Sequence, residues 1–244
     1  MTLLFVADHA SAHVPPDIDL GIPDAWLADH IAVDIGAAAL TAALQAQFAA
    51  PAVVAAVSRL VIDLNREPER VDLIPVLSDG RRIDGNVGLT PAERQRRIDT
   101  YFTPYHAAVS AAIARHRPLL IVSVHSFTPA LASRDEARPW PWPIGILYNH
   151  DDRAARTALA WLSERQVNVG DNLPYSGRDL NYTMNRHAEA NGIAYLGIEI
   201  RQDLLADVDG IAAWTARLAA LIEHVRLTLM APVGQDSDRS GEAA

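Results

Sequence analysis

The chain contains neither cysteine nor lysine, and each absence narrows its function. Without cysteine there is no disulfide framework and no thiolate ligand, so a metal ion must be held by histidine and carboxylate side chains. Every one of the 21 basic Lys/Arg positions is arginine, and the formal net charge is −9. Because a nucleic-acid binder normally presents a basic surface, we expect no nucleic-acid partner.

Long apolar runs are also missing. No stretch approaches the roughly 18 apolar residues that are needed to span a bilayer, so we expect no membrane partner. The first seven residues are apolar but short and carry no basic segment, which predicts a buried strand rather than a signal peptide. The lack of cysteine is compatible with the cytoplasmic location that we expect. The sequence does not indicate an oligomeric state.

Half of the 244 residues are apolar, enough for a sizeable core, and strand-like runs alternate with helical spacing. The expected strands are residues 2–7, 52–64, 119–125, 144–149 and 193–200, and the expected helices are residues 24–47, 90–115, 151–165, 181–191 and 204–229. This alternation predicts an α/β fold with a mostly parallel sheet that helices cover on both faces. We expect one domain over residues 1–231 and a disordered polar tail over residues 232–244.

Polar side chains collect where the predicted strands end. His9 follows the first strand and His125 ends the middle one, although two histidines 116 positions apart are also compatible with ordinary loop residues. Glu199 lies within an apolar strand, where a carboxylate must be paired, metal-bound or shifted in pKa. Arg201 shares its strand face, so the two side chains could form a salt bridge or both face a site. In an open α/β sheet such a cluster marks the ligand crevice.

Residues 58–66 form the most informative run, a strand-like stretch that ends in Asp-Leu-Asn-Arg. It supplies Arg59, Asn65 and Arg66, and a guanidinium group offers a planar fork of donors that matches a carboxylate. Asp63 and Arg66 could instead be a local ion pair that organises the turn. Asp34, on the apolar face of the first predicted helix, either reaches toward the strand ends or pairs with an arginine.

With these motifs, the chain resembles the N-formylglutamate amidohydrolase family and, more distantly, the zinc carboxypeptidases and aspartoacylases. The resemblance runs from residues 8–10 through 58–66 and 124–127 to 199–204. It implies a three-layer α/β/α sandwich around a mixed, mostly parallel sheet of the phosphorylase/hydrolase-like type. It also implies one metal ion, expected to be Zn²⁺, and hydrolysis of an N-formyl or other small N-acyl amino acid by metal-activated water.

The resemblance also implies roles for individual residues. His9 and His125 would be metal ligands, and Glu199 would be the general base. Arg59 would stabilise the oxyanion. The substrate carboxylate would be held by Asn65 and Arg66, with Arg201 as a further substrate-binding residue.

One departure concerns the third metal ligand. Zinc carboxypeptidases read His-x-x-Glu after the first strand, whereas this chain reads His-Ala-Ser-Ala from His9. Asp34 is the first replacement candidate, and Asp8 and His13 are the others, among which spacing does not choose.

Three rival functions stay open at this point. One is an amino- or carboxypeptidase of the same architecture, which a wide pocket would favour. Another is a non-catalytic carboxylate-binding protein on a degenerate scaffold, supported by the missing carboxylate ligand. The third is a phosphate-handling α/β protein, which the lack of a glycine-rich phosphate loop disfavours.

Overall fold

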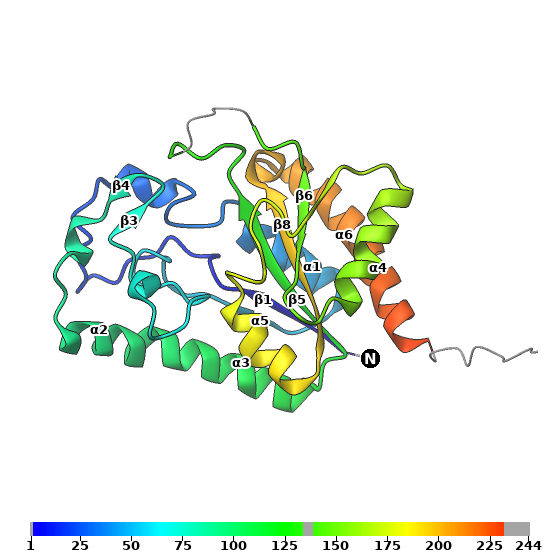
Figure 1. Cartoon of the computed structure of the whole chain (residues 1–244), viewed down its shortest axis with the longest axis horizontal. Helices are drawn as coiled ribbons and strands as arrows, with labels where there is room; N and C mark the ends of the chain where they lie inside the picture. The colour runs from blue at the N-terminus through cyan, green and yellow to red at the C-terminus, as the bar shows by residue number, and fades with distance from the viewer. Residues whose placement is uncertain (1, 134–138, 232–244) are drawn as a thin grey trace, which may run out of the picture.

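A computed structural model describes residues 2–133 and 139–231. Within these residues, six strands form one sheet in the order β2-β1-β5-β8-β6-β7 (Figure 1). The strands are β1 (Leu3–Ala7), β2 (Ala52–Val54), β5 (Leu120–Phe127), β6 (Ile144–Leu147), β7 (Val169–Asp171) and β8 (Ala194–Arg201). Within this sheet, only the β6–β8 pair is antiparallel, and a separate antiparallel hairpin is formed by β3 (Leu77–Ser78) and β4 (Arg81–Arg82). The predicted mixed, mostly parallel sheet is therefore confirmed.

The three central strands are β1, β5 and β8, and each is almost entirely buried. Their continuous apolar runs are typical of strands covered on both faces. Because all three run in the same direction, their carboxyl ends meet at one edge of the sheet. That edge is where an α/β sheet normally holds its ligand.

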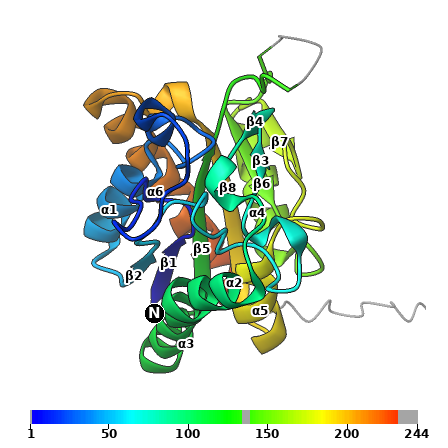
Figure 2. The same ribbon diagram turned by 90° about the vertical axis from the view of Figure 1, so that its left-hand side faces the viewer.

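Helices pack on both sides of the sheet. On one side, α6 (Val208–Met230) contacts α1 (Ala37–Phe48) and α4 (Arg153–Glu164), and α1 and α6 lie together in Figure 2. On the other side, α3 (Thr103–His116) contacts β1, β2 and α5 (Tyr182–His187). The layers of helix, sheet and helix match the expected α/β/α sandwich.

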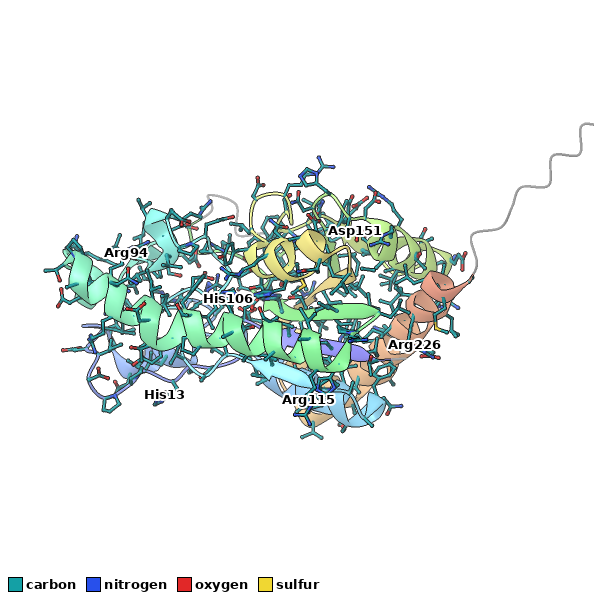
Figure 3. All side chains as sticks on the ribbon, turned by 90° about the horizontal axis from the view of Figure 1, so that it is seen from below. His13, Arg94, His106, Arg115, Asp151 and Arg226 are labelled. Carbon is teal, nitrogen blue, oxygen red and sulfur yellow. The ribbon has the colours of Figure 1, made fainter. Side chains whose placement is uncertain are left out.

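The helix before α3 begins as predicted. Thr90 accepts a hydrogen bond from the backbone of Glu93, whose side chain accepts one from the backbone of Thr90, so the capping box is formed at the start of α2 (Pro91–Arg97). A π-helical turn over Ile98–Phe102 joins α2 to α3. The long helical unit runs along the bottom of the view in Figure 1 and crosses in front of the sheet in Figure 3, which is seen from below.

The prediction of one helix over residues 24–47 was wrong. A short 3₁₀ helix covers Asp24–Ala28, and α1 begins only at Ala37. Gly36 separates the two with φ of 82°, and a Cβ atom there would lie 2.5 Å from the side chain of Leu205. The break at Gly36 leaves Asp34 in an irregular segment, where its backbone N–H donates to His9 O at 2.9 Å.

The prediction of a strand over residues 52–64 was also wrong beyond Val54. The chain turns there because Ser58 organises the backbone: its hydroxyl donates to Ala32 O at 2.8 Å and accepts from Leu60 N at 3.1 Å. The apolar residues of this run are buried in the core without pairing in the sheet. Arg59, Asn65 and Arg66 therefore lie on turns and not on a strand end.

The remaining differences are smaller. The short strand β7 was missed because residues 168–180 read as irregular, and the last helix begins at Val208 with Asp207 as its N-cap. Among the described residues, no helix is both long and apolar enough to cross a membrane. The tail predicted to be disordered, residues 232–244, lies outside the described residues.

Candidate active site

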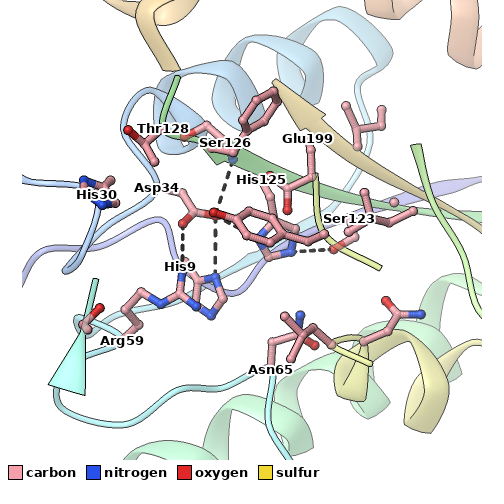
Figure 4. Close-up of a pocket in the computed structure, with 18 of the residues that line it drawn as sticks. His9, His30, Asp34, Arg59, Asn65, Ser123, His125, Ser126, Thr128 and Glu199 are labelled. Atoms are coloured by element: carbon pink, nitrogen blue, oxygen red, sulfur yellow. Dashed lines mark hydrogen bonds and ion pairs between the residues drawn. The ribbon is translucent and has the colours of Figure 1, made fainter. Parts of the chain in front are cut away.

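The histidines predicted from the strand ends meet beside Glu199 (Figure 4). His9 comes two residues after β1, while His125 on β5 is the direct cross-strand partner of Glu199 on β8. The parallel register of these strands brings side chains more than 70 positions apart into one crevice. All three residues are buried and line the same pocket.

Asp34 completes a group that could hold a metal ion. Its Oδ2 lies 2.8 Å from Nδ1 of His125 and 3.5 Å from Nδ1 of His9. Ligand atoms bound at about 2.0–2.1 Å in a tetrahedral zinc site are separated from one another by about 3.3 Å, so these separations suit such an ion. Two imidazole nitrogens and one carboxylate oxygen are also the donor types that zinc prefers.

A second carboxylate orients each histidine. Nε2 of His9 lies 2.8 Å from Oδ1 of Asp63, and Nε2 of His125 lies 3.4 Å from Oδ2 of Asp8 and 3.1 Å from Oγ of Ser123. At His9 the carboxylate of Asp63 accepts the hydrogen on Nε2, and at His125 the hydrogen bond of Nε2 is with Ser123 while Asp8 forms an ion pair. Both arrangements leave the lone pair of Nδ1 for a metal ion, as is usual behind metal-binding histidines. Asp8 and Asp63 thus support the cluster and do not belong to it.

Charge pairing dominates the electrostatics of the cluster. Burial raises the pKa of Asp34, but His9 and His125 together lower it by more, so the net shift is downward. Burial and Arg59 lower the pKa of His9, but Asp63 and Asp34 raise it, and the net shift is upward. Burial lowers the pKa of His125 as well, but its contacts with Asp34 and Asp8 raise the pKa by more, and the net shift is strongly upward. Without an ion, the cluster therefore favours carboxylates facing protonated imidazoles.

Asp8 is held from the opposite side of the cluster. The hydroxyl groups of Tyr105 and Thr183 donate to its Oδ1 at 2.5 and 3.0 Å. Its Oδ2, which faces His125, is fully buried and makes no hydrogen bond among the described residues. His13, the remaining candidate for the third ligand, is exposed and does not line the pocket, so of the three candidates the geometry favours Asp34.

Arg59 is locked in place by two carboxylates of the site. Its guanidinium group lies 3.3 Å from Oδ1 of Asp34 and 3.0 Å from Oδ2 of Asp63. The latter contact shows that Asp63 is more than a turn residue, because it holds both His9 and Arg59. The positive charge of Arg59 is therefore fixed at the edge of the group formed by His9, Asp34 and His125, facing the pocket.

Arg66 is held more loosely than Arg59. It lies 3.7 Å from Asp63 and 3.5 Å from Asp72, and its buried Nε makes no hydrogen bond among the described residues. Its neighbour Asn65 accepts a hydrogen bond from Thr183 N at 3.0 Å, which leaves the amide nitrogen of this pocket residue for a ligand. The two adjacent side chains could together receive an anionic group.

Glu199 is the one carboxylate of the pocket whose pKa is raised, to about 7. Burial is the main cause, and the nearby positive charge of His125 opposes it. Its Oε2 is buried and has no hydrogen-bond partner among the described residues. A carboxyl group with a pKa near neutrality can both accept and return a proton.

Arg201 does not join these residues. Its Nε lies 2.8 Å from Asp203, another of its nitrogens donates to Trp140 O at 3.1 Å, and it is not among the described residues that line the pocket. We therefore give it no substrate contact. Arg201 shares a strand face with Glu199, but β8 ends at Arg201 and its side chain turns to local partners, so the two residues neither pair nor face the same pocket.

The pocket has a volume of about 240 Å³ and an apolar as well as a polar wall. Lining residues that the sequence did not predict for the site include His30, Ser78, Asp79, Ser123, Thr128, Leu131, Ser133, Leu147, Tyr175, Leu180 and Asn181. Most of them come from irregular segments, for which periodicity carries no signal. Asp79 links two of these irregular segments, because its carboxylate accepts hydrogen bonds from the backbones of Ala132 and Ser133 at 2.9 and 2.8 Å.

Comparison with known proteins agrees with this geometry. A family model described as N-formylglutamate amidohydrolase matches residues 1–206, a span that contains every residue of the site. The chain belongs to the N-formylglutamate amidohydrolase family. Membership supports an amide-hydrolysing activity and a small-molecule substrate, as the resemblance implied.

Solved structures carry the same fold. This amidohydrolase-family chain is 35% identical to a gene product of Agrobacterium tumefaciens, with a TM-score of 0.88 over 93% of this chain and 91% of that one. An N-formylglutamate amidohydrolase from Ralstonia eutropha is 22% identical, with a TM-score of 0.71 over 93% of each chain, and at that identity it supports the fold alone. No curated protein matches at a significant level.

Proposed function

We propose that this chain is a zinc-dependent amidohydrolase that cleaves the amide bond of a small N-acyl amino acid, with N-formylglutamate as the first candidate. The observation that carries the proposal is the convergence of His9, Asp34 and His125 beside a buried Glu199 whose pKa is raised. That combination supplies a site for a cation and, next to it, a group able to transfer protons.

The zinc ion would be held by Nδ1 of His9, a carboxylate oxygen of Asp34 and Nδ1 of His125. When bound, such an ion acts as a Lewis acid and lowers the pKa of water to about 7. Asp63 and Asp8 keep the two imidazole rings oriented, as their distances to Nε2 indicate.

Glu199 is assigned the proton transfers. Its carboxylate takes a proton from the attacking water as the new C–O bond forms. It then gives that proton to the amide nitrogen as the C–N bond breaks, so that the carboxylic acid and the amine leave. General acid–base catalysis of this kind contributes about 10²–10⁴-fold to the rate.

Arg59 is assigned to the developing negative charge on the carbonyl oxygen. Its ion pairs with Asp34 and Asp63 fix the guanidinium group before substrate binds, and a preorganised charge is what transition-state stabilisation needs. The substrate carboxylate is assigned to Asn65 and Arg66, because a bidentate guanidinium contact would fix the substrate relative to the metal-ligand group.

The size of the pocket favours a small substrate over a peptide. About 240 Å³ is near the lower end of the range for small-molecule sites, which runs from about 300 to 1,000 Å³. The position of Asp34 also weakens the degenerate-scaffold alternative, because it provides the carboxylate that the His-Ala-Ser-Ala segment lacks.

The test is hydrolysis of a panel of N-formyl and N-acetyl amino acids by the purified protein, with and without substitution Glu199→Gln. Wild type should release free amine from at least one member, and Glu199→Gln should lower kcat by about 10²-fold or more while metal content is kept. Glu223→Gln is the matched control, because Glu223 lies on α6 and pairs with Arg226 at the surface. Equal turnover by wild type and Glu199→Gln would overturn the assignment.

A further inference from the structure

Tyr175 is the one tyrosine that lines the pocket, among the residues that the structure describes. It lies on the loop after β7, which the sequence predicted only as irregular. Its hydroxyl group makes no hydrogen bond with any described residue, although the side chain is partly buried. A polar group placed in a pocket without a protein partner is available to a ligand.

Glycines allow the loop to cross the sheet close to Glu199. Leu173 O approaches two of them so closely that a Cβ atom would lie 2.2 Å from it at Gly145 and 2.4 Å at Gly170. Gly145 is also the cross-strand neighbour of Glu199 in the β6–β8 ladder. No residue with a side chain could occupy either position without moving the loop, so the path of the backbone that leads to Tyr175 is fixed beside the general base.

The loop is anchored on its other side as well. The side-chain oxygen of Asn172 accepts hydrogen bonds from Tyr148 N at 3.0 Å and Gly177 N at 3.1 Å. Gly177 packs against Tyr148, where a Cβ atom would lie 2.6 Å from the carbonyl oxygen. Tyr175 is therefore held between two anchored points, Leu173 and Gly177, and is not carried on a free loop.

Tyr175 keeps its hydroxyl hydrogen in the pocket that it lines. Burial, followed by the negative charge of Glu199, raises the pKa of Tyr175, and Arg59 opposes the shift. The phenol therefore keeps its hydrogen at neutral pH and can donate it. The loop that carries Tyr175 passes over Gly145, the cross-strand partner of Glu199, so Tyr175 enters the pocket from the side of the proposed base.

We propose that Tyr175 is a further catalytic residue, whose hydroxyl donates a hydrogen bond to the scissile acyl carbonyl oxygen opposite Arg59. This inference rests on the proposed amidohydrolase function and adds a second donor to the oxyanion site. A donor on a glycine-packed loop is preorganised, so it strengthens its bond as negative charge develops on the oxygen. The hydroxyl transfers no proton, since Glu199 supplies that step.

The test compares Tyr175→Phe with Tyr148→Phe on the best substrate of the panel. Tyr175→Phe removes only the hydroxyl group and should lower kcat by about 10²-fold, with KM changed by less than about threefold. Tyr148→Phe removes a hydroxyl that contacts Asp171 and Arg156 beneath the same loop, and it should leave both constants nearly unchanged. An unchanged kcat in Tyr175→Phe overturns the proposal, as does a rise in KM alone or an equal loss in Tyr148→Phe.

A binding measurement separates this inference from the function itself. A phosphonate analogue, in which a tetrahedral phosphonate replaces the scissile carbonyl, is titrated calorimetrically into wild type and Tyr175→Phe. Weaker binding by Tyr175→Phe supports the contact even if wild type hydrolyses no member of the panel, a result that would count against the proposed function only. Equal affinities, or no binding to wild type, overturn the contact.

Discussion

The ring centroids of His9 and His125 lie 5.1 Å apart, and those of His106 and His187 lie at the same separation. Both pairs are buried, and both join elements that are distant in sequence. Their surroundings are opposite. The first pair is in contact with the carboxylates of Asp8, Asp34 and Asp63, whereas the hydrogen-bond partners of the second pair are neutral groups.

The His106–His187 pair forms a chain of neutral hydrogen bonds between α3, where Figure 3 labels His106, and α5. His106 Nε2 lies 3.0 Å from Leu64 O, which can only accept, so this nitrogen carries the hydrogen. Nδ1 of His106 then accepts from Nε2 of His187 at 2.9 Å. Burial lowers the pKa of each histidine to about 4.

Burial alone therefore does not make a histidine functional, because both pairs are buried to a similar extent. In the first pair, carboxylates offset the cost of burial, raise the pKa of each imidazole and orient one nitrogen toward the pocket. In the second pair, the charge of Asp8 offsets burial only in part, and His106 holds the backbone at Leu64, next to Asn65. The His106–His187 pair is structural, and it supports the loop that carries the proposed carboxylate-binding residues.

The largest expected difference between the pairs is in turnover. His125→Ala removes a proposed metal ligand and should lower kcat/KM by at least about 10³-fold, with loss of bound metal. His187→Ala, the matched substitution in the other pair, should keep turnover within a few-fold. Initial rates and elemental analysis of both variants provide the measurement, and a comparable loss of turnover in both would abolish the distinction.

Stability against pH should show the second largest difference. Because the folded-state pKa values of His106 and His187 lie below the usual 6.5, the unfolded chain binds protons first as pH falls. Stability is therefore fully present above about pH 6.5 and is lost as pH falls toward about 4, by on the order of 2 kcal/mol.

Urea unfolding of wild type and His187→Gln between pH 7 and pH 4 measures this contribution. Wild type should be the more stable protein at pH 7, and the difference should shrink as the pH is lowered. A difference that stays constant across the range would contradict the neutral state of the buried pair.

An intermediate effect is expected for the carboxylate behind His9. Asp63→Asn replaces the acceptor of Nε2–H by a neutral amide and should weaken zinc binding about 10–100-fold. Competition with a chelator measures the affinity, and Asp84→Asn, at an exposed ion pair with Arg82, is the control. Unchanged affinity would mean that Asp63 serves Arg59 alone.

The smallest expected effect is a change in the pKa of His187 when a carboxylate is placed beside it. The hydroxyl of Ser110 lies 3.4 Å from Nδ1 of His187 and is near the surface. Ser110→Asp should raise the pKa of His187 by about one unit, since a nearby negative charge favours the protonated imidazole. An NMR titration of the ring provides the value, and no shift would argue against the electrostatic explanation of the comparison.

The sequence predicted the first histidine pair better than the second. His9, His125 and Glu199 could be found because each terminates or occupies an apolar strand, and parallel strands bring their carboxyl ends together. The burial of His106 and His187 could not be found in this way, because helical spacing does not say which face of α3 the helix α5 will cover.

The turn residues were less predictable than the strand residues. Asp34 was predicted on the inward face of a helix. It reaches the cluster from an irregular segment, because α1 begins only after Gly36. Asp63, whose carboxylate contacts Nε2 of His9, could be interpreted from the sequence only as part of a local turn, since no spacing rule links positions 9 and 63. Tyr175 gave no signal at all, because its place depends on glycines in three separate segments.

The most direct test of the central claim is the metal content of the purified protein measured together with its turnover. We expect about one zinc ion per chain, loss of metal and activity on chelation, and recovery of both when zinc is returned. We also expect that His9→Ala does not bind the metal, while His106→Ala does. Stoichiometric zinc in His9→Ala, or full turnover by the chelated wild-type protein, would contradict the assignment of the metal to His9, Asp34 and His125.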